Sequence, residues 1–376
     1  MNRTDPKSNA PIMMLSAGNG FIMQSEKYSR DNAGQSLKKY ILLKQGELAY
    51  NHGASKAKQF GCCYELTEPE ARIPYVYHCF KINEDEYTPY VAMALNNAKM
   101  DQQLKRLVSS SVRMDGLLNI SFEDYMSVTL HLPSFIEQKH IADFLKKLDD
   151  RIDYQERLIT SLKKYKRGLL RAVFSEKSSH YLLSDAAILR VGEVCDVLSG
   201  KRIPKGETFC PYPTEYRYIT VSDMGEKFVC SDALQYITAH TEKQISRYKV
   251  KNGDIIISVA GTLGKLNIIT SDLEGVNLTE NCDRFTNFRG ISSEYLYYVL
   301  SSDLIQSQIE ASKTKNGQPK LALERIRNFT IPVPKQTTQE QLVNVMISID
   351  QHIASQVAIL DKYCNLKVGL LQQLFI

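Results

Sequence analysis

The sequence predicts an α+β protein in which two mixed α/β domains alternate with two long helices, as an internal pseudo-twofold duplication. Three observations lead to this prediction. Residues 138–174 recur without a gap 201 positions later, at 339–375. Both segments place apolar residues at alternating steps of three and four, the spacing of a coiled-coil seam. The residues that precede each segment show strand and helix patterns in a similar order.

The two long segments agree in identity as well as in spacing. Under the shift of 201, Thr129, Pro133, Gln138, Asp149, Ile152, Gln155, Lys166, Gly168, Leu169, Leu170 and Phe174 match Thr330, Pro334, Gln339, Asp350, Ile353, Gln356, Lys367, Gly369, Leu370, Leu371 and Phe375. The seams are Ile141, Leu145, Leu148, Ile152, Gln155, Ile159, Leu162 and Leu169, then Leu342, Met346, Ile349, Ile353, Gln356, Leu360, Tyr363 and Leu370. We therefore expect the two helices to pack together as an antiparallel coiled coil.

Two glutamines interrupt these seams near the midpoints of the helices. Gln155 and Gln356 are equivalent positions, and equivalent residues on a pseudo-twofold axis face each other. A buried amide without a partner is costly, so we predict that Gln155 and Gln356 hydrogen-bond and fix the helix-helix register. The same register sets Ile141 opposite Leu370, Leu148 opposite Tyr363, Leu162 opposite Ile349 and Leu169 opposite Leu342.

The first half of the chain is expected to hold a domain at 1–133 and a helix at 134–177. Within the domain, we predict two strands in Lys39–Asn51 around a Gln45-Gly46 turn, a strand in Pro74–Phe80, a helix over Tyr87–Val108 and a strand-like exit at Ser127–Pro133.

The second half repeats this plan, with a domain at 178–334 and a helix at 335–376. We predict a linker at Ser175–Asp185, a strand in Arg190–Leu198, strand Val250–Val259 with an Asn252-Gly253 turn, a helix over Ser293–Ser312 and an exit strand at Asn328–Pro334. The counterpart of 190–206 would fall before Met1, so the first domain is expected to lack one strand and one basic loop.

Composition restricts the class of protein. With 376 residues, 43% hydrophobic and 24% charged, the chain is long enough for two domains. It has no apolar run of membrane-spanning length and no signal-peptide pattern, so we expect a cytoplasmic protein. Eight cysteines without a CxxC pair are expected to be reduced and mostly buried, with no metal site. A net charge of +5 permits a nucleic-acid partner without proving one.

Several segments of the chain resemble those of a known protein family. They are the helix entries LPSFIEQKHIADFLKKLDDRI and IPVPKQTTQEQLVNVMISIDQHI, the helix endings YKRGLLRAVF and NLKVGLLQQLF, and the second-domain phrases DVLSGKRIPKG, YITVSDM and NGDIIISVAGTLGK. With them, essentially the whole chain resembles a specificity (S) subunit of a type I restriction-modification system. It departs from the family pattern in two places. The first domain is short at its N-terminal end, and the segment that leads into the second helix has Thr338 where the segment that leads into the first helix has Glu137.

The resemblance implies two target-recognition domains separated by the long helices. It implies recognition of a bipartite double-stranded DNA site, positioning of methyltransferase (M) subunits, and restriction (R) subunits in the full complex. It also implies no catalysis and no cofactor. The residues agree, because the chain has no NPP[FY] motif, no glycine-rich loop for a methyl donor and no P-loop, GTLGK at 261–265 being too short.

A catalytic site of another kind lacks the necessary partners. A nucleophilic site could be drawn from His52 beside Asn51, or from Cys62-Cys63 with His78. Neither set has a recognisable partner acid or oxyanion loop in the sequence. We therefore predict no catalytic residue.

DNA contacts need Lys and Arg for phosphates, with Asn, Gln, Ser or Arg for base edges. The loops at 51–58, 109–116, 199–206 and 313–320 offer these side chains, and the second and fourth fall at equivalent points of the duplication. The alternative is that each is a solvated turn. The candidate DNA-binding residues are Asn51, Lys56, Lys58, Arg113, Lys201, Arg202, Lys205, Lys265, Lys313, Lys315 and Asn316.

The end of the first long helix is strongly basic. Its cations are Arg157, Lys163, Lys164, Lys166, Arg167 and Arg171. They are explained either by the helix dipole or by phosphate contacts. Two other functions also remain open for the whole chain. It could be a coiled-coil scaffold or interaction protein without specific DNA binding, or an unpaired specificity protein that acts as a regulator.

Overall fold

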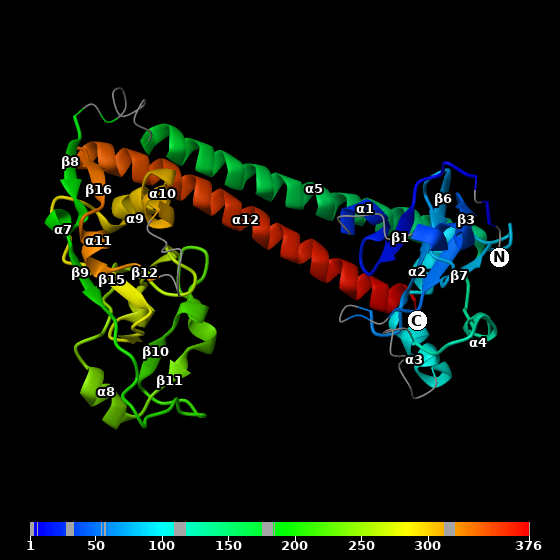
Figure 1. The fold of residues 1–376 in the computed structure, drawn as a ribbon, viewed down its shortest axis with the longest axis horizontal. Helices are drawn as coiled ribbons and strands as arrows, with labels where there is room; N and C mark the ends of the chain where they lie inside the picture. The colour runs from blue at the N-terminus through cyan, green and yellow to red at the C-terminus, as the bar shows by residue number, and fades with distance from the viewer. Residues whose placement is uncertain are drawn as a thin grey trace. The chain divides into compact units, whose positions relative to one another are not determined.

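The computed structural model describes residues 4–5, 7–27, 34–53, 55, 58–108, 118–174, 183, 185–311 and 320–375. The chain is a mixture of helices and strands (Figure 1). It divides into two compact units, one of Met1–Glu156 with Ala358–Ile376 and one of Arg157–Val357. Each is described separately.

The first unit contains small antiparallel sheets and, in its described part, four short α-helices. Its elements are β1 (Met13–Ser16), β2 (Gly20–Met23), α1 (Gln24–Lys27), a 3-10 helix (Gly34–Lys39), β3 (Ile41–Lys44), β4 (Leu48–Asn51), β5 (Cys62–Glu65), β6 (Glu70–Ile73), β7 (His78–Phe80), α2 (Thr88–Ala94), α3 (Ala98–Leu107), α4 (Phe122–Met126) and parts of α5 (Phe135–Phe174) and α12 (Gln336–Leu374). Strand β1 pairs with β2, β3 with β6, and β4 lies between β5 and β7.

Strands β3 and β4 lie where the sequence predicts two strands, but they belong to different sheets. Gly46 between them has a φ of 79°, which favours glycine. Glu47 closes this turn, because its carboxylate accepts the Lys44 N–H at 2.8 Å. The strand predicted in Pro74–Phe80 is shorter and begins at His78. A turn precedes it, in which the Tyr77 N–H donates to the carbonyl of Pro74.

The helix predicted over Tyr87–Val108 is two helices, α2 and α3. The chain leaves the helical path after α2, and the Asn97 side chain starts α3 by accepting the Met100 N–H at 2.8 Å. Asparagine favours this capping position because its oxygen satisfies a helix N–H that has no partner within the helix. The apolar spacing alone therefore missed a break that a polar cap creates.

A buried glutamine joins the first turn of α5 to the rest of the first unit. The Gln138 Oε1 atom accepts the Tyr87 N–H at 2.9 Å, and Nε2 donates to the Pro133 carbonyl at 2.9 Å. Beyond it, Ala142 and Leu145 of α5 share a cluster with Phe375. The first part of α5 and the last part of α12 thus pack in one core.

The second unit is richer in strands. Its elements are β8 (Ala187–Arg190), α7 (Val191–Val194), β9 (Asp196–Ser199), β10 (Arg217–Ile219), 3-10 helices (Val221–Asp223, Ser231–Ala233, Ser271–Leu273), β11 (Gln235–Tyr236), α8 (Ala239–Ile245), β12 (Ile255–Ser258), β13 (Leu266–Ile268), β14 (Asn277–Leu278), β15 (Cys282–Thr286), α9 (Ser293–Ser301), α10 (Asp303–Ala311), α11 (Leu323–Arg327), β16 (Thr330–Val333) and the other parts of α5 and α12. The strand orders are β13-β12-β15-β9, β11-β10-β14 and β16-β8.

The predicted helix over Ser293–Ser312 is also broken in two. Helices α9 and α10 meet at Ser302, whose buried hydroxyl donates to the Val299 carbonyl at 2.6 Å. The strand predicted in Arg190–Leu198 is likewise interrupted, by the single turn of α7. The carboxylate of Glu193 accepts the Arg190 N–H at 2.5 Å and so caps that turn.

The two predicted exit strands differ. Thr330–Val333 forms β16, paired antiparallel with β8. Residues 128–134 form no strand and pair with no strand in the described part of the first unit. The sequence prediction of a strand at Ser127–Pro133 is therefore wrong. The physical reason is that a strand persists only where a partner accepts its backbone hydrogen bonds.

A second buried glutamine joins α12 to the second unit. The Gln339 Oε1 atom accepts the Ser292 N–H at 3.0 Å, and Nε2 donates to the Pro334 carbonyl at 2.9 Å. Val173 and Phe174 of α5 lie in the same large core cluster as residues of α12. All eight cysteines are free, and five of them are buried, as the sequence predicts. In the described ranges, no helix has the length and apolar character to span a membrane.

Candidate nucleic-acid interface

Several predicted contact residues of the second unit follow or precede strands that end at one edge of its four-stranded sheet. Strand β9 ends at this edge with Ser199, which pairs with Asp283 of β15. Strand β12 ends there with Ser258, which pairs with Cys282. The loop after β9, the loop after β12 and the segment before β15 therefore lie next to one another.

Backbone contacts hold the first of these loops in place. The Gly200 N–H donates to the Cys282 carbonyl at 3.0 Å, and the Lys201 N–H donates to the Leu278 carbonyl at 2.8 Å. A Cβ atom on Gly200 would lie 2.0 Å from the carbonyl oxygen of Thr279, so only glycine fits at this position. The loop is thus fixed where it leaves the sheet.

The three basic residues predicted in this loop are exposed. Lys201 carries its ammonium 5.9 Å from the ring centre of Tyr248. Lys205 is exposed. Arg202 has a side chain that is 78% exposed, and its Nε lies 2.5 Å from the Glu280 carboxylate. The charged groups of Lys201 and Arg202 thus each lie beside a neighbouring side chain, the ring of Tyr248 and the carboxylate of Glu280.

Glu280 is an ionised partner for Arg202. Burial alone would raise the pKa of Glu280, but hydrogen bonds from Arg202 and Thr279 hold that pKa below its usual value. A cavity of about 430 Å³ opens beside the pair. Phe209, Ser222 and Asn281 line it together with the ion pair. The cavity thus combines an aromatic face with several polar groups.

Lys265 lies nearby but is turned inward. Its N–H donates to the Ser258 hydroxyl at 2.9 Å, and its half-buried ammonium donates to the Met224 carbonyl. This lysine therefore ties the loop after β12 to the segment at 224.

After residue 311 the described chain resumes at Lys320, which lies at the same edge of the sheet. Lys320 pairs with Ala260, and the Leu321 N–H donates to the Val259 carbonyl at 2.9 Å. Asp283 lies close to this lysine. Burial raises the pKa of Asp283 to about 6, against the lowering effects of Ser199 and of the nearby cations. Lys313, Lys315 and Asn316 lie outside the described residues.

In the first unit, the two described candidates serve local structure. The Asn51 side chain accepts the Gly53 N–H at 3.0 Å. The Lys58 ammonium donates to the Asn96 carbonyl at 3.0 Å. Lys56 and Arg113 lie outside the described residues.

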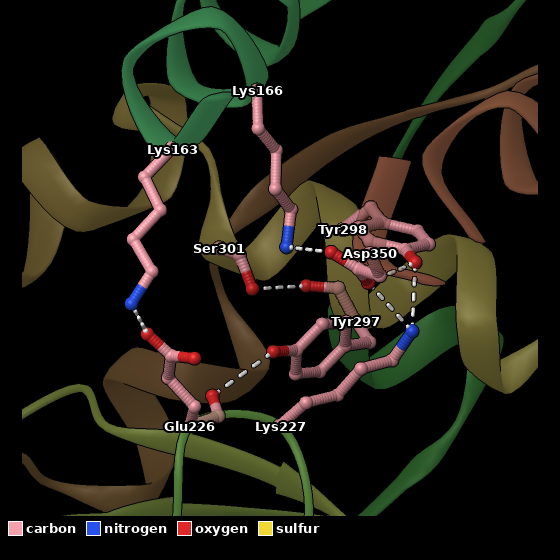
Figure 2. A network of polar contacts seen from close by, with 8 residues as sticks. All are labelled: Lys163, Lys166, Glu226, Lys227, Tyr297, Tyr298, Ser301 and Asp350. Atoms are coloured by element: carbon pink, nitrogen blue, oxygen red, sulfur yellow. Dashed lines mark hydrogen bonds and ion pairs between the residues drawn. The ribbon is translucent and has the colours of Figure 1, made fainter. Parts of the chain in front are cut away.

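The basic end of α5 has a function that neither sequence interpretation included. Lys163 pairs with Glu226 and Lys166 with Asp350 of α12, as Figure 2 shows. Each ammonium lies 2.5 Å from its carboxylate. Arg171 lies 3.7 Å from Asp303. These cations attach α5 to α12 and to the strand-rich part of the second unit.

Asp350 is the centre of this network (Figure 2). Its carboxylate accepts Lys166, Lys227 at 2.8 Å and the Tyr298 hydroxyl at 2.7 Å. Burial alone would raise the pKa of Asp350, but these three donors hold it below its usual value. The Lys227 ammonium also lies 4.8 Å from the ring centre of Tyr298. The network joins α5, α12 and α9 through one carboxylate.

Sequence reasoning did not identify Glu280, Lys227 or Asp350 as functional. Glu280 follows a strand and lies 78 residues from Arg202 in the chain, so no local pattern links the two. Asp350 did have one signal, because it matches Asp149 under the shift of 201. An acid repeated beside a coiled-coil seam marks an inter-helix pair.

Comparison with protein families places residues 184–362 in a family described as type I restriction modification DNA specificity domain. Among curated proteins, the MjaVIII specificity subunit of a type I restriction enzyme from Methanocaldococcus jannaschii is 22% identical over 261 residues. That alignment covers 65% of this chain and 61% of the relative. The EcoBI specificity subunit from Escherichia coli is 23% identical, over 62% of this chain and 53% of the relative. The chain thus matches little more than half the length of these relatives.

Solved structures share the fold. A structure from a study of complex assembly and conformational transition of the type I system aligns with a TM-score of 0.61 at 17% identity, over 100% of this chain and 94% of that one. The S subunit of a type I system from M. genitalium aligns with a TM-score of 0.56 at 15% identity, over 99% and 90%.

Proposed function

We propose that this chain, which is similar to type I restriction-modification specificity subunits, reads a bipartite DNA site and positions methyltransferase subunits on it. The observation that carries the proposal is the gathering of Lys201, Arg202, Lys205 and Lys320 at one edge of a sheet in the second unit. Exposed cations suit phosphate contacts, and the polar cavity beside them suits base edges.

Reading two half-sites requires two related domains, and we propose the boundaries 1–133 and 178–334 for them. The turns before β4 and β12 support this. Gly253, like Gly46, has a positive φ, and the Asp254 carboxylate accepts the Lys251 N–H at 2.9 Å just as Glu47 accepts Lys44.

The ends of the two predicted contact loops give further support. Leu118, the first described residue after one loop, donates its N–H to the His52 carbonyl at 2.9 Å. Leu321, just after the other, donates its N–H to the Val259 carbonyl at 2.9 Å. His52 and Val259 occupy the same place after β4 and β12, so Leu118 and Leu321 bond to equivalent points of the two units.

The long helices, which we place at 134–177 and 335–376, also carry repeated contacts. Asp149 pairs with Lys367 within the first unit, and Asp350 pairs with Lys166 within the second. Because the shift of 201 converts one pair into the other, a single contact occurs twice. We infer that the helices are an antiparallel spacer between two recognition domains, which would present two equivalent surfaces to methyltransferase subunits.

The full complex would also contain restriction subunits, and the chain itself would neither methylate nor cut. Selection from random duplexes by the full chain, with and without a type I methyltransferase subunit, tests this. Enrichment of two short motifs at a constant separation is the expected result.

Two other results would assign another function. Binding that selects no sequence and does not weaken with salt would indicate a scaffold, because phosphate neutralisation makes DNA binding salt-dependent. Selection of a motif by a chain that captures no methyltransferase subunit would indicate a regulator.

A further inference from the structure

We propose that Arg202 reads a guanine in the half-site bound by the second unit, and that Glu280 positions Arg202 for this contact. The inference rests on the proposed function and adds to it one base, one groove and one pair of residues. The base would be met in the major groove, where guanine presents its O6 and N7 acceptors side by side.

The first support is the way the guanidinium is held. Its Nε lies 2.5 Å from Oε1 of Glu280. The other carboxylate oxygen, Oε2, accepts the Thr279 hydroxyl at 3.0 Å. Both oxygens of the carboxylate are thus engaged, which fixes the plane of the group that Arg202 faces.

The second support comes from the two terminal nitrogens of the Arg202 guanidinium. In the described part of the chain, no acceptor bonds the two terminal nitrogens of Arg202, and the side chain is 78% exposed. A guanidinium has a planar fork of five N–H donors, and the terminal pair matches two adjacent acceptors. Glu280 therefore engages the Nε atom of Arg202 and leaves the two terminal nitrogens, which can form a bidentate contact, exposed to solvent.

The third support is the rigidity of the base from which Arg202 extends. The preceding residue, Lys201, donates its N–H to Leu278 at 2.8 Å and accepts the Tyr218 hydroxyl at 2.6 Å. A base contact needs a side chain that is fixed in advance, whereas a phosphate contact tolerates a mobile cation. Lys205, exposed in the same loop, suits the phosphate contact.

The cavity beside the pair fits the same reading. Its lining includes Asn281 and Ser222, which can contact neighbouring base edges, and Phe209, which offers an apolar face. Arg202 and Glu280 also line this cavity.

The sheet also provides a matched control. Arg289 pairs with Asp196 at 2.8 Å, with side chains 48% and 43% exposed. Asp196 begins β9, whereas Ser199 ends it, so this second Arg-carboxylate pair lies at the opposite edge of the sheet. Its loss should not affect DNA selection.

The experiment is selection from random duplexes by the full chain with its methyltransferase partner, for the parent, Arg202→Lys, Arg202→Ala, Glu280→Ala and Arg289→Ala. In the parent, we expect one guanine in one half-site whose replacement by 7-deazaguanine, which lacks N7, weakens binding. Arg202→Lys keeps the charge but not the fork. It should reduce the preference for that guanine by roughly 5- to 150-fold and leave the other positions unchanged. Glu280→Ala should reduce the same preference, and Arg289→Ala should not.

Other outcomes would overturn the inference. If both Arg202 variants select the parent motif with uniformly weaker binding and Arg202→Ala lowers the salt dependence, Arg202 contacts a phosphate. If they select the parent motif with unchanged affinity, Arg202 makes no contact. In both cases the proposed function stands. If the parent selects no motif, the proposed function fails and this inference fails with it. Thermal unfolding of each variant identifies any loss of folding.

Discussion

The Tyr298 hydroxyl of α9 donates a hydrogen bond of 2.7 Å to the Asp350 carboxylate of α12. Lys227 donates to the same hydroxyl at 2.7 Å and to the same carboxylate at 2.8 Å. These three side chains form a closed polar triangle that attaches α12 to the rest of the second unit.

Tyr298→Phe should destabilise the second unit. The change removes the hydroxyl from a carboxylate and an ammonium that are both largely buried, which costs about 1 to 2 kcal/mol. Tyr297→Phe is the matched control, because the neighbouring hydroxyl donates a long hydrogen bond of 3.4 Å to the uncharged Glu226 carbonyl. Denaturant unfolding should show a clear loss for the first variant and a smaller one for the second. Equal losses would contradict the triangle.

Asp350→Asn should be more harmful than Asp149→Asn, although the two positions are equivalent under the shift of 201. The Asp350 side chain is 17% exposed and faces two ammonium groups, so its loss costs about 3 kcal/mol. Asp149 is 40% exposed and pairs with Lys367, with no second cation among the described residues, so its loss costs below about 1 kcal/mol. Thermal unfolding of both variants at neutral pH gives the comparison, and a reversed order would exclude our assignment.

Asp283 predicts a dependence of stability on pH. Its pKa in the folded protein is about 6, above the value of about 4 for an unfolded aspartate. A group with a raised pKa contributes its full stability below the unfolded pKa and loses it as the pH rises through the folded pKa. Asp283→Asn should therefore gain stability relative to the parent at about pH 8, by up to about 3 kcal/mol, and little at about pH 4.

Asp196 provides a control of opposite sign. Hydrogen bonds from Asn287 and Arg289 lower the pKa of Asp196. Its contribution is present above the unfolded pKa and is lost as the pH falls through the folded pKa. Asp196→Asn should therefore lose stability relative to the parent at about pH 8 rather than gain it. The same sign for both variants in unfolding experiments would refute the Asp283 prediction.

The predicted contact loop at 313–320 can be tested directly. Lys313→Ala combined with Lys315→Ala should weaken DNA binding and reduce its salt dependence by about one unit of slope for each lost phosphate contact. Binding is measured at several salt concentrations, and unfolding temperature serves as the control for folding. Unchanged affinity would exclude these two lysines as contacts.

The glutamine pair remains a prediction, because Gln155 and Gln356 belong to different units. Gln155 is buried and Gln356 is half-buried. If they bond each other, Gln155→Leu alone leaves one amide unsatisfied and costs about 1 to 3 kcal/mol. Gln155→Leu with Gln356→Leu should then recover the parent's stability. Simple additivity in a double-mutant cycle would mean that the two side chains do not interact.

The features that the sequence by itself determined are local ones. The helices α5 and α12 follow from a repeat of three and four residues, because a helix places such residues on one face. The turns at Gly46 and Gly253 follow from residues that tolerate a positive φ. The exposed positions of Lys201, Arg202 and Lys205 follow from a loop rich in glycine, proline and charge. Each signal lies within a few residues of the structure that it predicts.

Only the tertiary structure decided which charges pair with which. The sequence offered the helix dipole or phosphate contacts for the basic end of α5, and the structure instead gives Lys163 and Lys166 the carboxylates of Glu226 and Asp350. Likewise, Arg202 meets Glu280 because β9 and β15 are neighbours in one sheet. The partner of an ion is fixed by distance in space, and strand order and helix packing bring together residues whose separation along the chain carries no signal.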